Sequence, residues 1–413
     1  MSGFSPGDLL VKKFMITSDR GSLDLSKSFV SASIYESIFT PGIIVDIEVL
    51  DTDDQIGALK ISGDEKVDIT FEVPGGSSAT YKLGISSLGE VKGETSSLKH
   101  KTYKINTVSI EALKAKNNYV EKTFSAQISD IIKTIHKDYL QSSKKIEVEE
   151  TKGKQDIKIS HKNPYEAIEI AMKRAVSSEN KSSLFVFFET RSGSEQIFKF
   201  TTIEKLFKGS SVKTFKQSDS INTSMSNKTD DQIFGVETPN QFNAVDRIAV
   251  GGQVKVATFN FRTWEYTKNT ITKSSKDYKT GGGQDINTGK FNQEYREPQG
   301  QAKPRLLLIP VDTSQRAKTS IPTYIADRQT FASTLMQGTV KLRVPGDLKL
   351  KAGDVVTANL PTRKGTTENV KNDSSLSGKF LISRIHHDIG RQEEKPRYTC
   401  VIELLKGNPE SAK

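Results

Sequence analysis

The feature that most constrains this chain is a set of short segments in which apolar and polar residues alternate strictly. Residues 43–50, IIVDIEVL, place four aliphatic side chains on one face of a strand and two carboxylates on the other. Residues 67–73, VDITFEV, alternate equally well, and Pro-Gly pairs border both runs. Successive side chains of a strand point to opposite faces, so these runs predict half-buried strands joined by tight turns.

Similar strands are predicted at 29–39 and 101–110, and near the end of the chain at 379–389 and 397–405. Several short strands with Pro/Gly turns favour an antiparallel sandwich or barrel. Residues 338–360 predict two more alternating strands, folded as a hairpin about Pro-Gly and Ala-Gly-Asp turns. Its expected core face is Val340, Leu342 and Val344, and its expected outward row is Thr339, Lys341 and Arg343.

The middle of the chain changes to a helical pattern. Ser125 is placed to cap a helix, and Asn163 with Pro164 opens a second one, supported by Glu166 in a capping-box-like position. The first helix has an apolar stripe of Ile128, Ile131, Ile132, Ile135 and Tyr139. Strands are predicted at 145–150, 156–160, 184–189 and 196–201. This part therefore reads as a small α+β unit inserted after the first β-domain.

The β pattern then returns. Residues 244–250 and 253–261 resemble a hairpin around a Gly-Gly turn, and residues 267–304 are rich in Gly, Lys, Gln and Asn, which is typical of a long excursion. Asp327 is placed to cap a short helix that includes Leu335. The sequence Val-Pro-Gly ends a predicted strand at both 73–75 and 344–346. Such a repeat is expected if one β-domain arose by duplication of the other.

The expected fold class is α+β, mainly antiparallel β, with two tube-like β-barrel domains and an α+β insertion between them. The expected domains are residues 1–116 for the first barrel, 117–232 for the insertion, 233–266 with 328–408 for a discontinuous second barrel, and 267–327 for a peripheral, partly flexible excursion.

Composition limits the partners and the chemistry of the 413-residue chain. No apolar run approaches the roughly 20 residues of a membrane helix, so no membrane anchor is expected. The net charge of +10 comes from lysines and arginines spread among fifty acids, which favours a solvated surface over a nucleic-acid-binding patch. The single cysteine, Cys400, excludes an internal disulfide and lies on the apolar face of a strand, so it is predicted to be a core residue.

Few motifs suggest catalysis or metal binding. His386 and His387 are neighbours on a strand and point to opposite faces, so they cannot both reach one metal. The acidic cluster Asp51, Asp53 and Asp54 lacks the glycine and distal glutamate of an EF-hand loop. Glycines 281–283 lack the Lys-Ser/Thr of a phosphate loop. We therefore expect no catalytic residue, no cofactor and no metal, and a protein that is not an enzyme.

Segments in order along nearly the whole chain resemble the central baseplate hub (tail hub) proteins of contractile-tailed bacteriophages. They include SASIYESIFTPGIIVDIEVLDTDD, NPYEAIEIAMKRAVSSENKSSLFVFFET, VKLRVPGDLKLKAGDVVTANLP and SGKFLISRIHHDI. The resemblance implies a homotrimer in which each chain supplies two tube domains, so that six domains close a ring of pseudo-sixfold symmetry. The ring would join a trimeric central spike protein to a tail tube or tube-initiator protein, contact other baseplate proteins, and let phage DNA pass transiently through its lumen.

The resemblance also implies a location in the virion, at the tail baseplate, after assembly in the host cytoplasm. Any spike or peptidoglycan hydrolase is then expected on a separate polypeptide. Alternatives are a tail tube or tube-initiator protein, which would form hexamers, and a phage peptidoglycan hydrolase. The residues expected to meet a neighbouring molecule are Thr339, Lys341, Arg343, Lys349, Lys351, Asp354, Thr357 and Asn359.

Overall fold

The computed structural model describes residues 8–52, 55–73, 76–91, 101–179, 182–217, 230–240, 253–260, 264, 266–272, 305–311, 328, 335, 339–361, 372–373, 376–392 and 395–406. Within these residues the fold is mainly antiparallel β with few helices, which confirms the predicted α+β, mainly antiparallel character; the two predicted barrels remain a prediction. None of the described helices is both long and apolar enough to cross a membrane.

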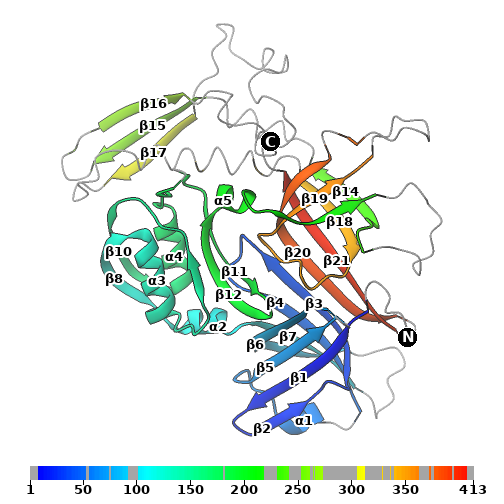
Figure 1. The fold of residues 1–413 in the computed structure, drawn as a ribbon. Helices are drawn as coiled ribbons and strands as arrows, with labels where there is room; N and C mark the ends of the chain where they lie inside the picture. The colour runs from blue at the N-terminus through cyan, green and yellow to red at the C-terminus, as the bar shows by residue number, and fades with distance from the viewer. Residues whose placement is uncertain are drawn as a thin grey trace.

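One sheet of thirteen strands dominates the described part of the chain (Figure 1). Its main path runs β14-β18-β21-β20-β3-β4-β7-β6-β5-β1-β2, and β19 adds to β20 and carries β13 on its other side. The strands of the first part are β1 (Leu10–Ser18), β2 (Gly21–Asp24), β3 (Phe29–Ser37), β4 (Ile44–Asp51), β5 (Lys66–Glu72), β6 (Ser78–Val91) and β7 (Lys101–Ser109). Those of the later part are β13 (Ser211–Lys216), β14 (Gly235–Asn240), β18 (Thr339–Pro345), β19 (Val355–Asn359), β20 (Gly378–Gln392) and β21 (Lys395–Lys406).

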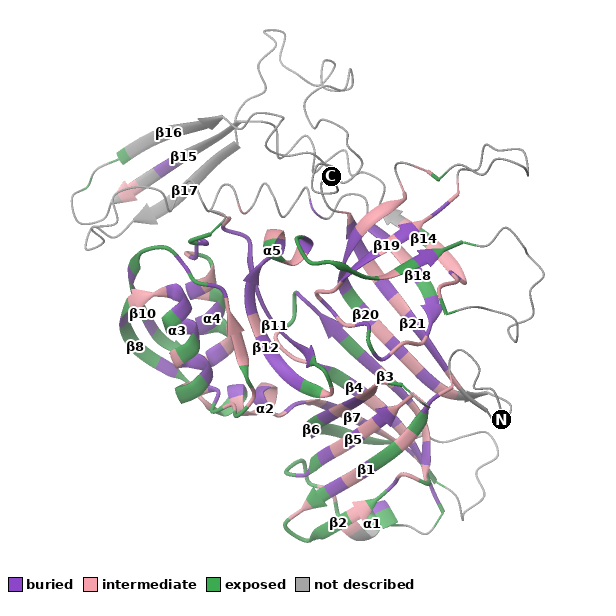
Figure 2. Ribbon diagram, viewed as in Figure 1, coloured by how far each residue is buried: buried purple, intermediate pink, exposed green. Residues whose placement is uncertain are grey.

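The predicted alternation matches the observed burial. The aliphatic face of residues 43–49 is fully buried, while Asp46 and Glu48 on the opposite face remain partly exposed. The same pattern in β5, β7 and β21 sends one face of the sheet into a single large core (Figure 2). Burial of these apolar side chains is the main favourable contribution to the sheet's stability.

The two halves of the sheet meet where β20 pairs with β3. The start of β20 pairs with β19, and its residues from Arg384 to Ile389 pair with β3 instead. An irregularity in the β20–β21 register between Ile382 and Arg384 marks this change of neighbour. There the carbonyl of Ser383 accepts a 2.9 Å hydrogen bond from the backbone N–H of Ile38. The bulge thus lets one long strand serve two neighbours.

The hairpin predicted for residues 338–360 is wrong. Within the described residues β18 pairs with β21 and β14, whereas β19 pairs with β20 and β13, so two strands lie between them. The predicted core face is nevertheless correct, because Val340, Leu342 and Val344 are buried. The connection 346–354 is held to other parts of the chain, as described below, and is too long for a tight hairpin turn.

The α+β unit contains strands β8 (Val120–Gln127), β9 (Ile146–Val148), β10 (Lys154–Lys162), β11 (Phe185–Ser192) and β12 (Glu195–Thr202). Its helical segments are α2 (Ile110–Asn117), α3 (Ile128–Thr134), the π-helical turn η1 (Ile135–Tyr139), α4 (Pro164–Met172) and α5 (Ile203–Phe207). Four residues of the predicted stripe are buried, and Tyr139 packs against the same core. One further short helix, α1 (Gln55–Leu59), lies earlier in the chain, between β4 and β5 of the first β part.

The predicted helix starts have different outcomes. Asn163 caps α4 as expected, since its Oδ1 accepts a 2.9 Å hydrogen bond from the backbone N–H of Glu166. The predicted cap at Ser125 is wrong, because β8 continues through Ser125 and α3 begins only after Gln127, which makes no side-chain cap bond. Pairing of Ser125 with Asp156 in the β8–β10 ladder keeps that residue extended.

Strand β11 belongs to two cores at once. Val186 and Phe188 lie in the main core, whereas Phe185 and Phe187 lie in the second core of the α+β unit. Figure 2 shows it as an almost continuously buried strand. A strand covered on both faces reads as a continuous apolar run, which explains the segment LFVFF.

A separate three-stranded sheet consists of β15 (Gln253–Asn260), β16 (Tyr266–Thr272) and β17 (Arg305–Val311). Here β15 pairs antiparallel with β16 and parallel with β17. The first strand of the hairpin predicted at 244–261 lies outside the described residues, as do Asp327 and residues 273–304.

Candidate interaction surfaces and a buried junction

Arg191 at the end of β11 is the largest fully buried side chain among the described residues. Its Nε lies 3.0 Å from Oε1 of Glu36 on β3, and both side chains are at most 1% exposed. The remaining guanidinium nitrogens donate to the backbone carbonyls of Leu348 at 2.8 Å and Leu350 at 2.9 Å. The Tyr81 ring lies 5.5 Å from the guanidinium carbon, so the cation is paired, hydrogen-bonded and covered.

The loop between β18 and β19 completes this network, here called the buried junction. Its Lys351 Nζ donates to the carbonyl of Arg191 at 2.8 Å, and Thr190 Oγ1 donates to the carbonyl of Ala352 at 3.2 Å. The backbone N–H of Ala352 donates in turn to Glu36 Oε2 at 3.3 Å. The junction therefore fastens the first β part, the α+β unit and the 346–354 loop to one another.

A second buried charge network lies beside the junction. Lys144 Nζ bridges Glu111 Oε2 and Glu189 Oε1, each at 2.6 Å, and Ser109 donates to the other oxygen of Glu189. Burial raises the pKa of Glu189, although Lys144 counteracts this. Burial also acts to raise the pKa of Glu111, but Lys144 and Ser142 outweigh it and leave that pKa lowered. The network fastens α2 to β11 rather than forming an open reaction site.

The eight residues predicted to meet a neighbour are spread over different environments. Arg343 and Lys349 are exposed, whereas Thr339 is only 6% exposed, which contradicts its expected outward position. Lys351 is used in the buried junction. The partly exposed members are Lys341, Lys351, Asp354, Thr357 and Asn359.

Strand β19 already has intramolecular neighbours on both sides. Thr357 Oγ1 donates to Ser211 Oγ of β13 at 2.9 Å, and Asn359 accepts from the backbone N–H of Gln217. Asp354 lies in the crowded corner just before this strand, and burial raises its pKa to about 6 despite the nearby Lys351.

A row of side chains, here called the outer row, crosses six adjacent strands on the face opposite the main core. The cross-strand registers place directly opposite one another Arg343, Val401, His386, Tyr35, Ile44 and Val108. Tyr35 and Ile44 are 41% and 44% exposed, and the Tyr35 and His386 rings stack at 4.4 Å. An exposed apolar row of this kind is a candidate contact surface.

The two histidines point to opposite faces, as predicted. His386 lies in the outer row, while His387 is fully buried and its Nδ1 lies 2.8 Å from Tyr398 Oη. Burial lowers the pKa of His387 well below its usual value, so this imidazole is neutral. Cys400 is a core residue, as predicted, and burial raises the pKa of its thiol to about 12.

The acidic cluster at the end of β4 has a structural role in the part that is described. The carboxylate of Asp51 accepts from the backbone N–H groups of Gln55 at 3.1 Å and Ile56 at 2.9 Å, which fixes the start of α1. Asp53, Asp54 and glycines 281–283 lie outside the described residues. Within the described ranges no group of three or more potential ligands is arranged to hold a metal.

The buried junction was missed by the sequence reasoning, although one signal for it exists. Glu36 occupies a core-facing position of an alternating strand between Ile34 and Ile38, where an acid must have a buried partner. Nothing local identifies Arg191 as that partner, because 155 residues separate the two.

Comparison with known proteins gave matches among solved structures only, since no protein-family model and no curated protein matches the chain. The tail protein from Neisseria meningitidis MC58 is 9% identical, with a TM-score of 0.58, and the match covers 97% of this chain and 98% of that one. The 43 kDa tail protein of prophage MuSo2 from Shewanella oneidensis is 12% identical, with a TM-score of 0.52 and coverages of 97% and 99%.

An Escherichia coli component of the type VI secretion system, described as structurally similar to the T4 tail proteins gp27 and gp5, is also similar. It is 8% identical, with a TM-score of 0.51, and the match covers 98% of this chain and 78% of that one. The likeness spans the α+β unit as well as both parts of the main sheet. The chain therefore has the fold of phage tail proteins.

Proposed function

We propose that this protein is the structural hub of a phage tail baseplate, and that it acts by assembly and not by catalysis. Three copies form a ring that joins a trimeric spike to the tail tube. The observation that carries the proposal is the end-to-end likeness to a tail protein, which covers 97% of this chain and 98% of the other. A likeness limited to one shared module would not account for the whole chain.

The hub role requires two tube-like units in each chain, and the proposed division is residues 1–116 and residues 233–266 with 328–408. Two strands are exceptions: β13, from the range 117–232, pairs with β19 and counts with the second unit, and β15, from the range 233–266, belongs to the separate three-stranded sheet. The rest of the α+β unit at 117–232 and the excursion at 267–327 lie outside the ring in this proposal. The division is supported by the two runs of strands that meet at the β3–β20 pairing (Figure 1). Three chains with two units each supply six equivalents around the axis.

Contacts at the ends of each run support a barrel-like shape. In the first part, the ring of Phe14 on β1 contacts the ring of Phe29 on β3, with the ring centroids 6.5 Å apart. In the later part, a bridge between Lys216 and Gln232 links β13 to the segment that leads into β14, the neighbour of β18. Each contact joins distant strands of its run, which favours curled sheets over flat ones.

Surface charge bears on the proposed passage of DNA. A channel lined with unpaired cations would hold phosphate groups, because each contact adds salt-dependent affinity. On the outward face of the sheet, Arg384 pairs with Glu403 at 3.0 Å and Lys104 lies 3.5 Å from Asp46. We infer that the excess lysine and arginine is directed away from the channel, toward acidic partners.

Native mass spectrometry of the full chain, with and without a co-expressed trimeric spike protein, tests the hub role. A species with three copies of this chain bound to one spike is expected. A hexamer of this chain would favour the tail tube or tube-initiator alternative. A chain that stays monomeric and does not bind the spike protein would contradict both roles.

Two variants test the proposed contact surface. The double variant R343E/K349E is expected to reduce the trimer, because it reverses the two most exposed members of the predicted interface. The matched control K158E reverses an exposed lysine on β10 of the α+β unit and should leave assembly unchanged. Equal assembly of both variants would remove Arg343 and Lys349 from the interface.

A further inference from the structure

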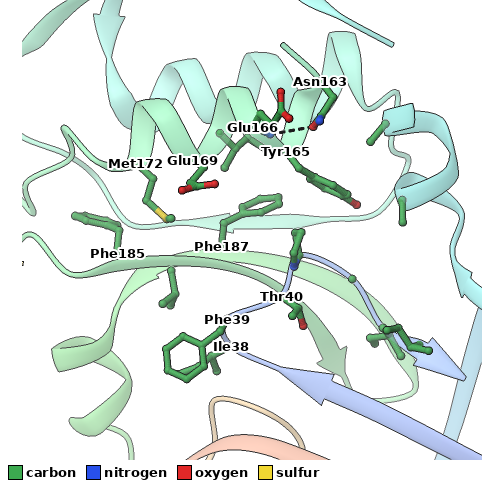
Figure 3. A pocket seen from close by; sticks show the side chains of 18 of the residues that line it. Ile38, Phe39, Thr40, Asn163, Tyr165, Glu166, Glu169, Met172, Phe185 and Phe187 are labelled. Carbon is green, nitrogen blue, oxygen red and sulfur yellow. Dashed lines mark hydrogen bonds between the residues drawn. The ribbon is translucent and has the colours of Figure 1, made fainter. Parts of the chain in front are cut away.

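An apolar pocket lies between the α+β unit and the turn that joins β3 to β4. Its volume is about 840 Å³. One wall is formed by α4 and β11, including Met172, Phe185 and Phe187, and the facing wall by residues 38–44 (Figure 3). A pocket of this size, with mostly apolar walls, is within the range that binds ligands or side chains of a partner.

Two buried polar atoms of the pocket residues have no hydrogen-bond partner within the described part of the chain. They are the hydroxyl of Tyr165, from the first turn of α4, and Nη1 of Arg328, which also lines the pocket. The Tyr165 ring lies between α4 and β11, 6.4 Å from the Phe187 ring (Figure 3). Both groups can donate a hydrogen bond, and a buried donor without an acceptor is costly. Each would be satisfied by an acceptor oxygen in the pocket, and a carboxylate is the best acceptor for the Arg328 guanidinium.

Neither acid that lines the pocket hydrogen-bonds to these two donors. The charge of Glu169 acts on Arg328, but its carboxylate pairs with Lys173 at 2.7 Å and is more than half exposed. The Glu166 side chain is exposed at the start of the same helix. Nη1 of Arg328 and the Tyr165 hydroxyl therefore remain available to a bound group.

The rim of the pocket continues onto the outer row. Ile44 and Val108 belong to both, and the 38%-exposed Phe39 also lines the pocket. From Ile44 the row leads across the strands to Tyr35 and its stacked partner His386. This continuation provides apolar contact for several side chains of a bound protein segment, beyond what the pocket alone would hold.

We propose that the pocket binds a protein segment with two or more large apolar side chains, a carboxylate that accepts a hydrogen bond from Arg328 and a further acceptor oxygen for Tyr165, while an apolar side chain lies on the outer row. The carboxylate is supplied by a chain terminus or by an Asp or Glu of that segment. The proposal does not depend on the ring or on the hub role, because it concerns one chain and one bound segment.

Calorimetric titration of the full chain tests it with two synthetic peptides. N-acetyl-Trp-Leu-Phe is used with a free C-terminal carboxylate and as the C-terminal amide. The free acid is expected to bind at least about tenfold more tightly, the size of one lost charge-assisted hydrogen bond. The variant R328Q should abolish this preference, and Y165F should weaken binding of the acid several-fold.

The control variant K158Q, on an exposed strand away from the pocket, should bind both peptides like the unmodified chain, and circular dichroism should show that every variant keeps its fold. Equal affinity for acid and amide, or an unchanged preference in R328Q, would overturn the proposal. Tighter binding of laurate than of the peptide would assign the pocket to a fatty acid instead. Absence of saturable binding at millimolar peptide would also overturn it.

Discussion

Arg191 Nε lies 3.0 Å from Glu36 Oε1, and the two residues join strands that are 155 positions apart in the sequence. Charges in the interior cost several kcal/mol unless they are paired and their remaining hydrogen-bonding groups are satisfied. Here the backbone carbonyls of Leu348 and Leu350 take the other guanidinium protons. We therefore expect the pair to contribute mainly by fixing how three chain segments are placed relative to one another.

Replacing Arg191 by Met is expected to lower the free energy of unfolding by about 3–5 kcal/mol, because Glu36 is left as an unpaired buried carboxylate. Urea unfolding followed by circular dichroism measures this loss. The double variant E36Q/R191M should recover part of it, since no buried charge then remains at the junction.

The matched control is an exposed ion pair of similar length. Lys12 and Glu72 lie 2.6 Å apart at the surface, and the Lys12 side chain is 65% exposed. The variant K12M should therefore change the free energy of unfolding by less than about 1 kcal/mol. If R191M were no more destabilised than K12M, the junction would not be a determinant of the fold.

Much of the local structure follows from the sequence because its causes are local. Strand alternation predicted which face of β4 and β21 is buried, and Asn163 before a proline predicted the start of α4. These signals depend on neighbours a few residues away. The cap predicted at Ser125 failed because a ladder to a distant strand extended β8 past it.

The arrangement of the strands could not be predicted in the same way. The pairing of β20 with β3 joins residues more than 300 positions apart. The alternation of apolar and polar residues in each strand shows which face is buried, but it does not show which other strand lies beside it. The separation of β18 from β19 depends on the junction, which uses backbone carbonyls of residues 346–354 that carry no sequence signal. The pocket at Tyr165 likewise arises only when distant segments meet.

Gly346 is expected to tolerate no side chain. A Cβ at this position would lie 2.1 Å from Cγ of the buried Tyr398, whose carbonyl also accepts from the Gly346 N–H at 3.0 Å. The variant G346A should lose about 3 kcal/mol of unfolding free energy through overpacking. Gly390 on β20 has no atom within 4 Å of its would-be Cβ, so G390A should change stability by less than about 1 kcal/mol. Equal effects of the two variants would contradict the packing at Tyr398.

Asp354 is expected to make stability fall as pH rises. Its pKa is raised by burial from 3.8 to about 6 in the folded chain. Between these values the folded state holds a proton that the unfolded state has released, so unfolding becomes easier with increasing pH. The variant D354N should lose this dependence and, above pH 6, exceed the unmodified chain by up to about 2 kcal/mol. Urea unfolding at a series of pH values measures both effects. Parallel profiles of the two proteins would contradict a raised pKa of Asp354.

Cys400 provides a direct reporter of the second half of the sheet, because it is the only cysteine of the chain. Its side chain is fully buried, and burial raises the pKa of the thiol to about 12, so it is both inaccessible and protonated at mildly alkaline pH. Since the thiolate is the reactive form, Ellman's reagent should label the folded chain at least about a thousandfold more slowly than the chain in concentrated urea. Destabilised variants such as R191M should speed the labelling of the folded chain by about tenfold for each 1.4 kcal/mol of unfolding free energy that they lose. Rapid labelling of one thiol per chain in native buffer would contradict the placement of Cys400 in the core.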